Sequence, residues 1–169
     1  MTHSMTPDAE ALYQLLLQQI KTGTAGLDKL AIVGIYSGGA WIAERLVKDL
    51  GLAQAAGMID VSFYRDDYAE RGLHTEVKPT QIPFEVDGAR IILVDDVLYT
   101  GRTTRAAINE LFDYGRPARV MLAALVDRGG RELPVAPDFV AHVASFEPSA
   151  SVNLQRAEDG KLRFSIDHA

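Results

Sequence analysis

An α/β fold, with a mainly parallel, doubly wound sheet flanked by helices, is the fold class that this sequence predicts. Short continuous apolar runs alternate along the chain with segments whose apolar residues recur at helical spacing. Such runs are typical of strands buried on both faces, as in parallel sheets. Polar turns follow the predicted strands, and α/β sheets bind ligands beyond the carboxyl ends of their strands.

The first helix is expected to begin at Thr6-Pro7-Asp8 and to end near residues 21–23. A capping hydroxyl, a proline in the first turn and an acid near the positive end of the helix dipole all favour this start. Residues 30–35 predict the next buried strand. A second helix follows and is stopped by Gly51.

The turn between that strand and helix is Tyr36-Ser37-Gly38-Gly39. A glycine pair lets the backbone come close to a ligand, and a helix N-terminus offers N–H donors to an anion. Ser37, Gly38 and Gly39 are therefore candidates for a phosphate-binding turn. The alternative is an ordinary tight turn.

Residues 58–65 alternate well enough for a strand, and residues 66–88 are then mostly polar and interrupted by Pro79 and Pro83. A long insertion inside a compact domain is often a flexible lid over a site. The alternative interpretation is a solvent-exposed loop that covers no site.

The central stretch runs from Ile91 to Thr103. Four aliphatic residues predict a buried strand that ends at the carboxylates Asp95 and Asp96. Residues 100–104 then predict a tight turn, followed by a helix that Gly115 ends.

This order of strand, acidic pair, small polar turn and helix has a chemical meaning. N–H groups at the start of a helix suit a phosphate. Carboxylates would repel that phosphate, so we expect Asp95 and Asp96 to face sugar hydroxyls or hydrated Mg²⁺. A phosphorylated sugar satisfies both requirements, whereas a turn capped by threonines alone would not need the two acids.

The remainder of the chain completes the sheet. Residues 120–126 and 139–144 predict two more buried strands, separated by a polar loop at 127–134. Residues 152–154 and 162–164 flank Asp159-Gly160, which predicts a C-terminal hairpin.

Length and composition predict one domain over residues 1–169, with residues 1–5 as a disordered tail. With 169 residues and 47% hydrophobic content, the chain can bury one sizeable core. Zero cysteines exclude disulfides and a cysteine nucleophile. We expect no membrane span and no secretory signal, hence a cytoplasmic protein. The net charge of −6 argues against general attraction to nucleic acid.

The stretch Val94-Asp95-Asp96-Val97-Leu98-Tyr99-Thr100-Gly101-Arg102-Thr103 resembles the phosphoribosyl pyrophosphate (PRPP) motif of type I phosphoribosyltransferases. Together with residues 60–67, 114–117 and 126–134, it is similar to the PyrR family of uracil phosphoribosyltransferases that also regulate pyrimidine genes. Purine-salvage relatives have a carboxylate at the fifth position of this motif, counted from its first acid, Asp95. Here that position is Tyr99, which is uncharged at neutral pH, so a purine substrate is disfavoured.

The resemblance implies that uracil and PRPP give UMP and diphosphate, with Mg²⁺ carried by the substrate and contacted only indirectly by Asp95 and Asp96. It assigns Asp95, Asp96 and Arg65 to catalysis, and Arg128 and Val152 to the base side. PRPP and nucleotide binding fall to Ser37, Gly38, Gly39, Val97, Leu98, Tyr99, Thr100, Gly101, Arg102 and Thr103.

The resemblance also implies a homodimer or homotetramer, and a regulator that binds pyrimidine-operon mRNA in response to UMP or PRPP. Two departures bear on this. Relatives have lysine and arginine where this chain has Tyr36 and Gly38, so diphosphate binding must rely on backbone donors. Residues 1–29 offer only Lys21 and Lys29 to RNA phosphates. The alternatives are an RNA-binding attenuation regulator with little catalytic activity, and a phosphoribosyltransferase for another base.

Overall fold

The computed structural model describes residues 6–61 and 79–168. Its centre is a five-stranded sheet in the order β2-β1-β3-β4-β5, and every pairing in it is parallel. The strands are β1 (Leu30–Ile35), β2 (Gly57–Ile59), β3 (Arg90–Leu98), β4 (Arg119–Asp127) and β5 (Phe139–Val143). The predicted parallel sheet is confirmed.

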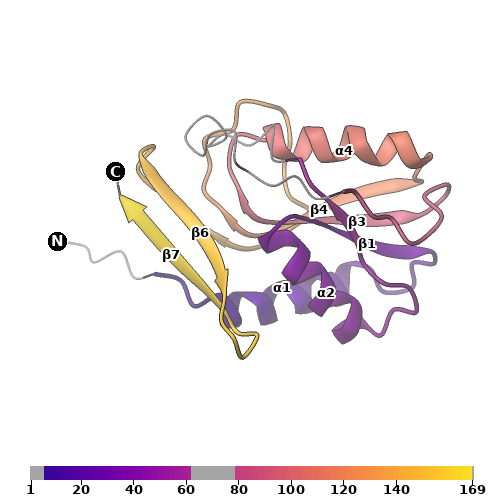
Figure 1. Ribbon diagram of the computed structural model, residues 1–169, viewed down its shortest axis with the longest axis horizontal. Coiled ribbons are helices and arrows are strands. Elements are labelled where there is room, and N and C mark those ends of the chain that lie inside the picture. The colour runs from indigo at the N-terminus through magenta and orange to yellow at the C-terminus, as the bar shows by residue number, and fades with distance from the viewer. Residues whose placement is uncertain (1–5, 62–78, 169) are drawn as a thin grey trace.

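Helices cover both faces of this sheet (Figure 1). One face packs against α1 (Ala9–Gly23) and α2 (Gly38–Leu50), and the other against α4 (Arg102–Tyr114). Side chains alternate across β3 accordingly: Ile92 belongs to the core on the α1 and α2 side, and Ile91 to the core beneath α4. This arrangement confirms the doubly wound fold.

Two predicted boundaries are wrong at the ends of elements. Helix α1 begins at Ala9, and its N-cap is Asp8 in place of the predicted Thr6, because the Asp8 carboxylate accepts the N–H groups of Glu10 and Ala11 at 3.1 and 3.3 Å. Strand β3 does not end at the acids but continues to Leu98, since β4 extends alongside it and pairs Leu98 with Asp127.

The strand predicted over residues 58–65 is shorter among the described residues. Strand β2 ends at Ile59, and residues 60 and 61 are not in a strand. Three segments lie outside the described residues: the end of this predicted strand (62–65), the first part (66–78) of the lid expected over residues 66–88, and the expected tail (1–5).

The chain closes with two antiparallel strands, β6 (Ala150–Arg156) and β7 (Leu162–His168), which contain the two segments expected to form the hairpin. They lie beside α1 and α2 at one end of the molecule, drawn in yellow in Figure 1. Leu154, Leu162 and Phe164 join the core on that side, so this pair of strands is packed onto the domain.

Helix α1 is anchored by two polar contacts as well as by its apolar face. The Tyr13 hydroxyl donates to Asp49 Oδ2 at 2.5 Å, and burial together with this bond raises the pKa of Tyr13 above its usual range. The Gln19 amide bonds both the N–H and the carbonyl of Val140 in the edge strand β5, at 3.0 and 2.8 Å. Gln19 thereby occupies part of an edge that could otherwise pair with another strand. None of the described helices is long and apolar enough to cross a membrane.

Candidate active site

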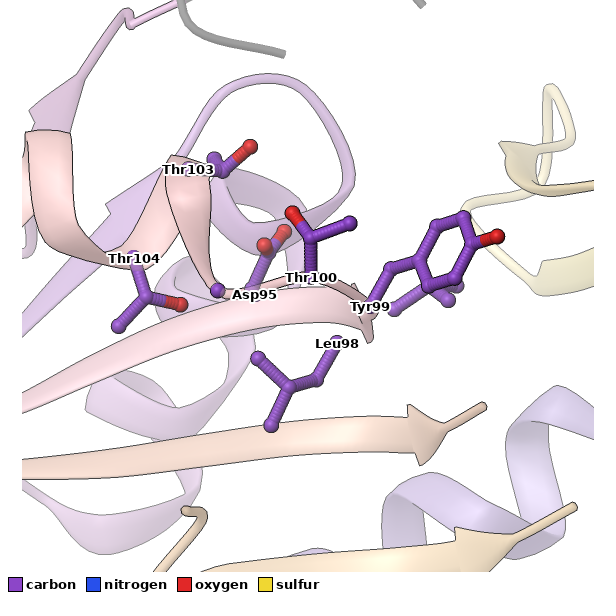
Figure 2. A pocket seen from close by; sticks show the side chains of 8 residues that line it. Asp95, Leu98, Tyr99, Thr100, Thr103 and Thr104 are labelled. Carbon is purple, nitrogen blue, oxygen red and sulfur yellow. The ribbon is translucent and has the colours of Figure 1, made fainter. Parts of the chain in front are cut away.

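A recess of about 220 Å³ lies where β3 ends and α4 begins (Figure 2). Figure 2 shows the Asp95 carboxylate and the hydroxyls of Thr100 and Thr103 on the same side of the end of this strand. The recess therefore gathers acceptors and hydroxyls from the motif that the sequence singled out. Its lining consists of Asp95, Val97, Leu98, Tyr99, Thr100, Gly101, Thr103 and Thr104.

The start of α4 forms one wall of the recess. Its N-cap, Gly101, has φ +98, a left-handed conformation that glycine adopts readily, and it has no side chain to cap the helix. Helix α4 starts at Arg102, so the tight turn predicted over residues 100–104 is wrong in its second half. Arg102, Thr103 and Thr104 form the first helical turn, where N–H groups have no intrahelical acceptor.

Thr104 has an unusual position in that first turn. It is 1% exposed, and among the described residues its hydroxyl has no hydrogen-bond partner. A buried polar group without a partner is costly, and such groups are rare in folded proteins. Thr104 lines the recess but was not among the predicted site residues.

The two acids are held by the backbone that follows each of them. Asp95 is 8% exposed, and its Oδ1 accepts the N–H of Asp96 at 2.9 Å. Asp96 is half-buried, and its Oδ1 accepts the N–H of Val97 at 2.9 Å.

The turn before α2 lies against this acidic pair. It starts with a cis peptide between Tyr36 and Ser37, and Ser37 caps α2 without a side-chain hydrogen bond. A Cβ on Gly38 would lie 2.5 Å from Asp96 Oδ2, and one on Gly39 would overlap the carbonyl oxygen of Val94. The glycines thus allow close packing of α2 on β3, a role that the sequence interpretation did not foresee. Diphosphate binding by this turn stays a prediction.

The polar loop after β4 is bonded to the end of β3. Arg131 donates from Nη1 to the Tyr99 carbonyl and from Nη2 to Asp127 Oδ2, both at 2.6 Å. Burial alone would raise the pKa of Asp127, but the bonds from Arg131 and from the Gly129 N–H outweigh it and lower the pKa. Asp127 and Arg131 were missed as site residues, although an acid and an arginine four positions apart in a loop at a strand end were a usable signal.

Arg128 was expected to lie against the base, and the structure places it against the Tyr99 ring. It is 8% exposed and donates to the carbonyls of Ala150 and Glu147 at 2.8 and 3.0 Å. Its guanidinium lies 4.1 Å from the centre of the Tyr99 ring. Arg128 therefore links Tyr99 to the segment that enters β6, the strand that carries Val152. Contact of Arg128 and Val152 with a base stays a prediction, and Arg65 lies outside the described residues.

Comparison with known proteins points to one family. The phosphoribosyl transferase domain model matches residues 6–148. A protein of Ralstonia nicotianae named bifunctional protein PyrR is 55% identical over 162 residues, which cover 94% of this chain and 92% of the relative. A Pseudomonas aeruginosa protein of the same name is 52% identical over 129 residues, or 76% of each chain.

Solved structures support the fold. A hypoxanthine-guanine phosphoribosyltransferase from Bacillus anthracis superposes with a TM-score of 0.65 at 19% identity and covers 84% of each chain. A hypoxanthine phosphoribosyltransferase from Trypanosoma cruzi gives 0.63 at 17% identity, covering 92% of this chain and 91% of that one. At this identity the likeness concerns the fold alone. The match of the domain model, the identity to the PyrR relatives and the shared fold together show that this chain belongs to the phosphoribosyltransferase family and, within it, to the PyrR family.

Proposed function

We propose that this protein transfers the phosphoribosyl group of PRPP to uracil, giving UMP and diphosphate. The observation that carries the proposal is the recess at the end of β3, where a buried acid, threonine hydroxyls and a helix N-terminus converge. A sugar phosphate presents anionic oxygens to the helix start and hydroxyl donors to the acid.

Each part of the substrate is assigned to a different group of residues in and around the recess. The 5′-phosphate would bind at the start of α4, to the N–H groups and hydroxyls of residues 99–103, with Val97 and Leu98 lining the nucleotide site. The carboxylates of Asp95 and Asp96 would accept hydrogen bonds from the ribose hydroxyls. Ser37, Gly38 and Gly39 would hold the diphosphate through the backbone at the start of α2.

The reaction places opposite charges at two ends of the sugar. As the bond between the anomeric carbon and the diphosphate breaks, positive charge develops on the ribose ring and negative charge on the leaving group. Carboxylates fixed by the backbone stabilise the ring without having to reorganise, and N–H groups do the same for the anions. Arg65 would face the leaving diphosphate as a planar donor. The main contribution of the protein is thus positioning and electrostatic stabilisation.

Mg²⁺ fits this site as a partner of the substrate. It is commonly held by one or two carboxylates together with substrate phosphates. Asp95 lines the recess, and Asp96, the next residue of β3, lies against the start of α2. They would contact it indirectly, while most of its ligands come from PRPP and water. When bound, the ion neutralises charge on the diphosphate.

Uracil is proposed as the base because of Tyr99. Tyr99 lines the recess at the position where purine-salvage relatives have a carboxylate, and the Arg128 guanidinium lies over its ring. Arg128 and Val152 would complete the base side. Competition assays with guanine, hypoxanthine and orotate test this choice, since a base other than uracil that blocks turnover completely would indicate another substrate.

The central experiment incubates purified protein with uracil, PRPP and Mg²⁺ and measures UMP and diphosphate. We expect turnover by the wild type and loss of at least about 100-fold in the double variant Asp95→Asn, Asp96→Asn, because removal of pre-organised charge costs this much in comparable sites. Asp159→Asn, in the exposed turn between β6 and β7, is the matched control. Absence of UMP from the wild type would refute the proposal.

A second activity, regulation by binding pyrimidine-operon mRNA, is favoured by the word bifunctional in the names of the relatives. Such binding should weaken as salt rises, because lysine and arginine release counterions from RNA phosphates. A gel-shift titration with leader RNA, with and without UMP, tests it. A shift that is absent, or insensitive to salt, would count against RNA-binding regulation and leave the transferase proposal untouched.

The chain is further proposed to act as one phosphoribosyltransferase domain, with residues 66–88 as a lid over the recess and with two or four copies in the assembly. Light scattering on the purified protein would measure the assembly. Limited proteolysis with and without PRPP would test the lid, because closure over the substrate should protect residues 66–88 from cleavage.

A further inference from the structure

Three consecutive carbonyl groups at the end of β3 are all bonded by the loop that follows β4. The Leu98 carbonyl accepts the N–H of Arg128 at 3.0 Å, and the Tyr99 carbonyl accepts Nη1 of Arg131 at 2.6 Å. The Thr100 carbonyl accepts the N–H groups of Glu132 and Leu133 at 2.9 and 3.1 Å. The loop therefore determines how each of these peptide groups is turned.

The orientation of a carbonyl also sets the direction of the next N–H. In a planar trans peptide the two groups point in opposite directions. With the Tyr99 carbonyl turned toward Arg131, the N–H of Thr100 points away from the loop. The Thr100 carbonyl orients the N–H of Gly101 in the same way. Both N–H groups thus point away from the loop, none of whose residues lines the recess, whereas Tyr99, Thr100 and Gly101 do line it.

Among these contacts, the one to Tyr99 is the only one that a side chain makes. Arg131 uses its whole guanidinium: Nη1 bonds the Tyr99 carbonyl, Nη2 bonds Asp127, and Nε donates to the Val135 carbonyl at 3.0 Å. The side chains of Arg131 and Asp127 are 23% and 13% exposed, so water competes weakly for these bonds. A planar fork suits three acceptors in fixed directions, and an ammonium group does not.

We propose that Arg131 is a positioning residue for the phosphate-binding turn. Held by Asp127, it turns the peptide between Tyr99 and Thr100 so that the N–H faces the 5′-phosphate, although Arg131 itself does not touch the substrate. This inference rests on the proposed function, because it concerns the phosphate end of the same site. It assigns part of the affinity for PRPP and UMP to a residue outside the recess.

The test compares UMP with uridine, which lacks only the phosphate, by calorimetric titration of wild type, Arg131→Met and Arg131→Lys. We expect the preference for UMP over uridine to fall about tenfold in Arg131→Met, the effect of losing one charge-assisted hydrogen bond, with uridine affinity unchanged. The KM for PRPP should rise by a similar factor while kcat changes less than about threefold, since the ribose end is untouched. Arg131→Lys should recover only part of the preference.

Arg105→Met is the matched control, because exposed Arg105 lies in the first turns of α4 and carries the same charge, while its side chain has no hydrogen bond to the turn among the described residues. If Arg105→Met lowers the preference as much as Arg131→Met does, the effect is long-range charge attraction and the proposal is wrong. An unchanged preference in folded Arg131→Met or Arg131→Lys also overturns it. If both Arg131 variants fail to fold, Asp127→Asn is measured in their place. Because it weakens the bond that holds Arg131, the preference for UMP over uridine should fall about threefold. An unchanged preference in Asp127→Asn would mean that the proposal is wrong. A wild type that does not distinguish UMP from uridine would instead refute the proposed function.

Discussion

Helices α2 and α4 both begin shortly after a parallel strand, at the same edge of the sheet, and neither N-cap residue, Ser37 or Gly101, makes a side-chain capping bond. Their surroundings differ. At α2, Gly38 and Gly39 are buried against the Asp96 carboxylate and the Val94 carbonyl. At α4, Gly101 and the threonines border an open recess of about 220 Å³.

This difference shows that small residues at a strand-to-helix turn can serve two purposes. At the start of α2 they let backbone approach backbone, and so hold the helix close to the acidic pair. At the start of α4 they border the recess in which we propose that the 5′-phosphate binds. The same sequence pattern is thus packed closely against β3 at one helix start and borders a recess at the other.

Among the variants that test this comparison of the two helix starts, Gly39→Ala is expected to have the largest effect. The added methyl would overlap the Val94 carbonyl oxygen, which belongs to β3 and cannot easily move. We expect a loss of about 2–3 kcal/mol in the free energy of unfolding, hence a Tm lower by roughly 4–12 °C by circular dichroism. Gly26→Ala is the control: with nothing within 4 Å, it should cost only about 1 kcal/mol for its positive φ. Equal Tm values for the two variants would contradict the packing role.

Gly101→Ala should affect binding as well as stability. Its φ of +98 is strained for alanine, and the new Cβ would lie 2.5 Å from Val135 Cγ2. We expect a stability loss of about 2 kcal/mol and a KM for PRPP raised about tenfold, because the N–H groups at the start of α4 move. Steady-state kinetics at varied PRPP measure this. A destabilised variant with unchanged KM would mean that this helix start does not bind the substrate.

Thr104→Val should have opposite effects on stability and on binding. It removes a buried hydroxyl that has no partner in the described part of the chain, so the free protein should gain about 1 kcal/mol, or roughly 2–4 °C in Tm. If the phosphate satisfies this hydroxyl, the KM for PRPP should rise a few-fold. Thr104→Ser retains the hydroxyl and should keep the KM. A lower Tm for Thr104→Val would show that the hydroxyl is already satisfied.

The smallest effect concerns pH and the loop that orients the start of α4. Because the folded-state pKa of Asp127 lies below its unfolded value of 3.8, the bond with Arg131 stabilises the protein fully above that value. The stabilisation is lost as the pH falls through the lower folded pKa. Asp127→Asn should therefore lower the Tm by about 2 °C at pH 7 and by less at pH 3. An equal difference at both pH values would contradict this role of the ionised carboxylate.

Much of the fold could be predicted from sequence because buried parallel strands and amphipathic helices leave local periodic patterns. Strand β1 and the ends of α2 and α4 at Gly51 and Gly115 were predicted at their actual positions. The end of β3 was not, because whether a strand continues past two acids depends on the pairing of β4 beside it. The N-cap of α1 was displaced from Thr6 to Asp8, since three adjacent residues offered competing starts.

The motif from Asp95 to Thr103 was recognisable without a structure, since acids, hydroxyls and a glycine at a strand-to-helix turn have few other combined uses. The bond from Arg131 to the Tyr99 carbonyl was not, because a hydrogen bond between residues 32 positions apart leaves no local pattern. The buried Thr104 hydroxyl was not either, because its burial depends on how distant elements pack. Local residue order determined which chemical groups this protein brings to the edge of its sheet. Packing of the β4 loop against β3 decided where they point, because the direction of an N–H group depends on what its neighbouring carbonyl bonds to.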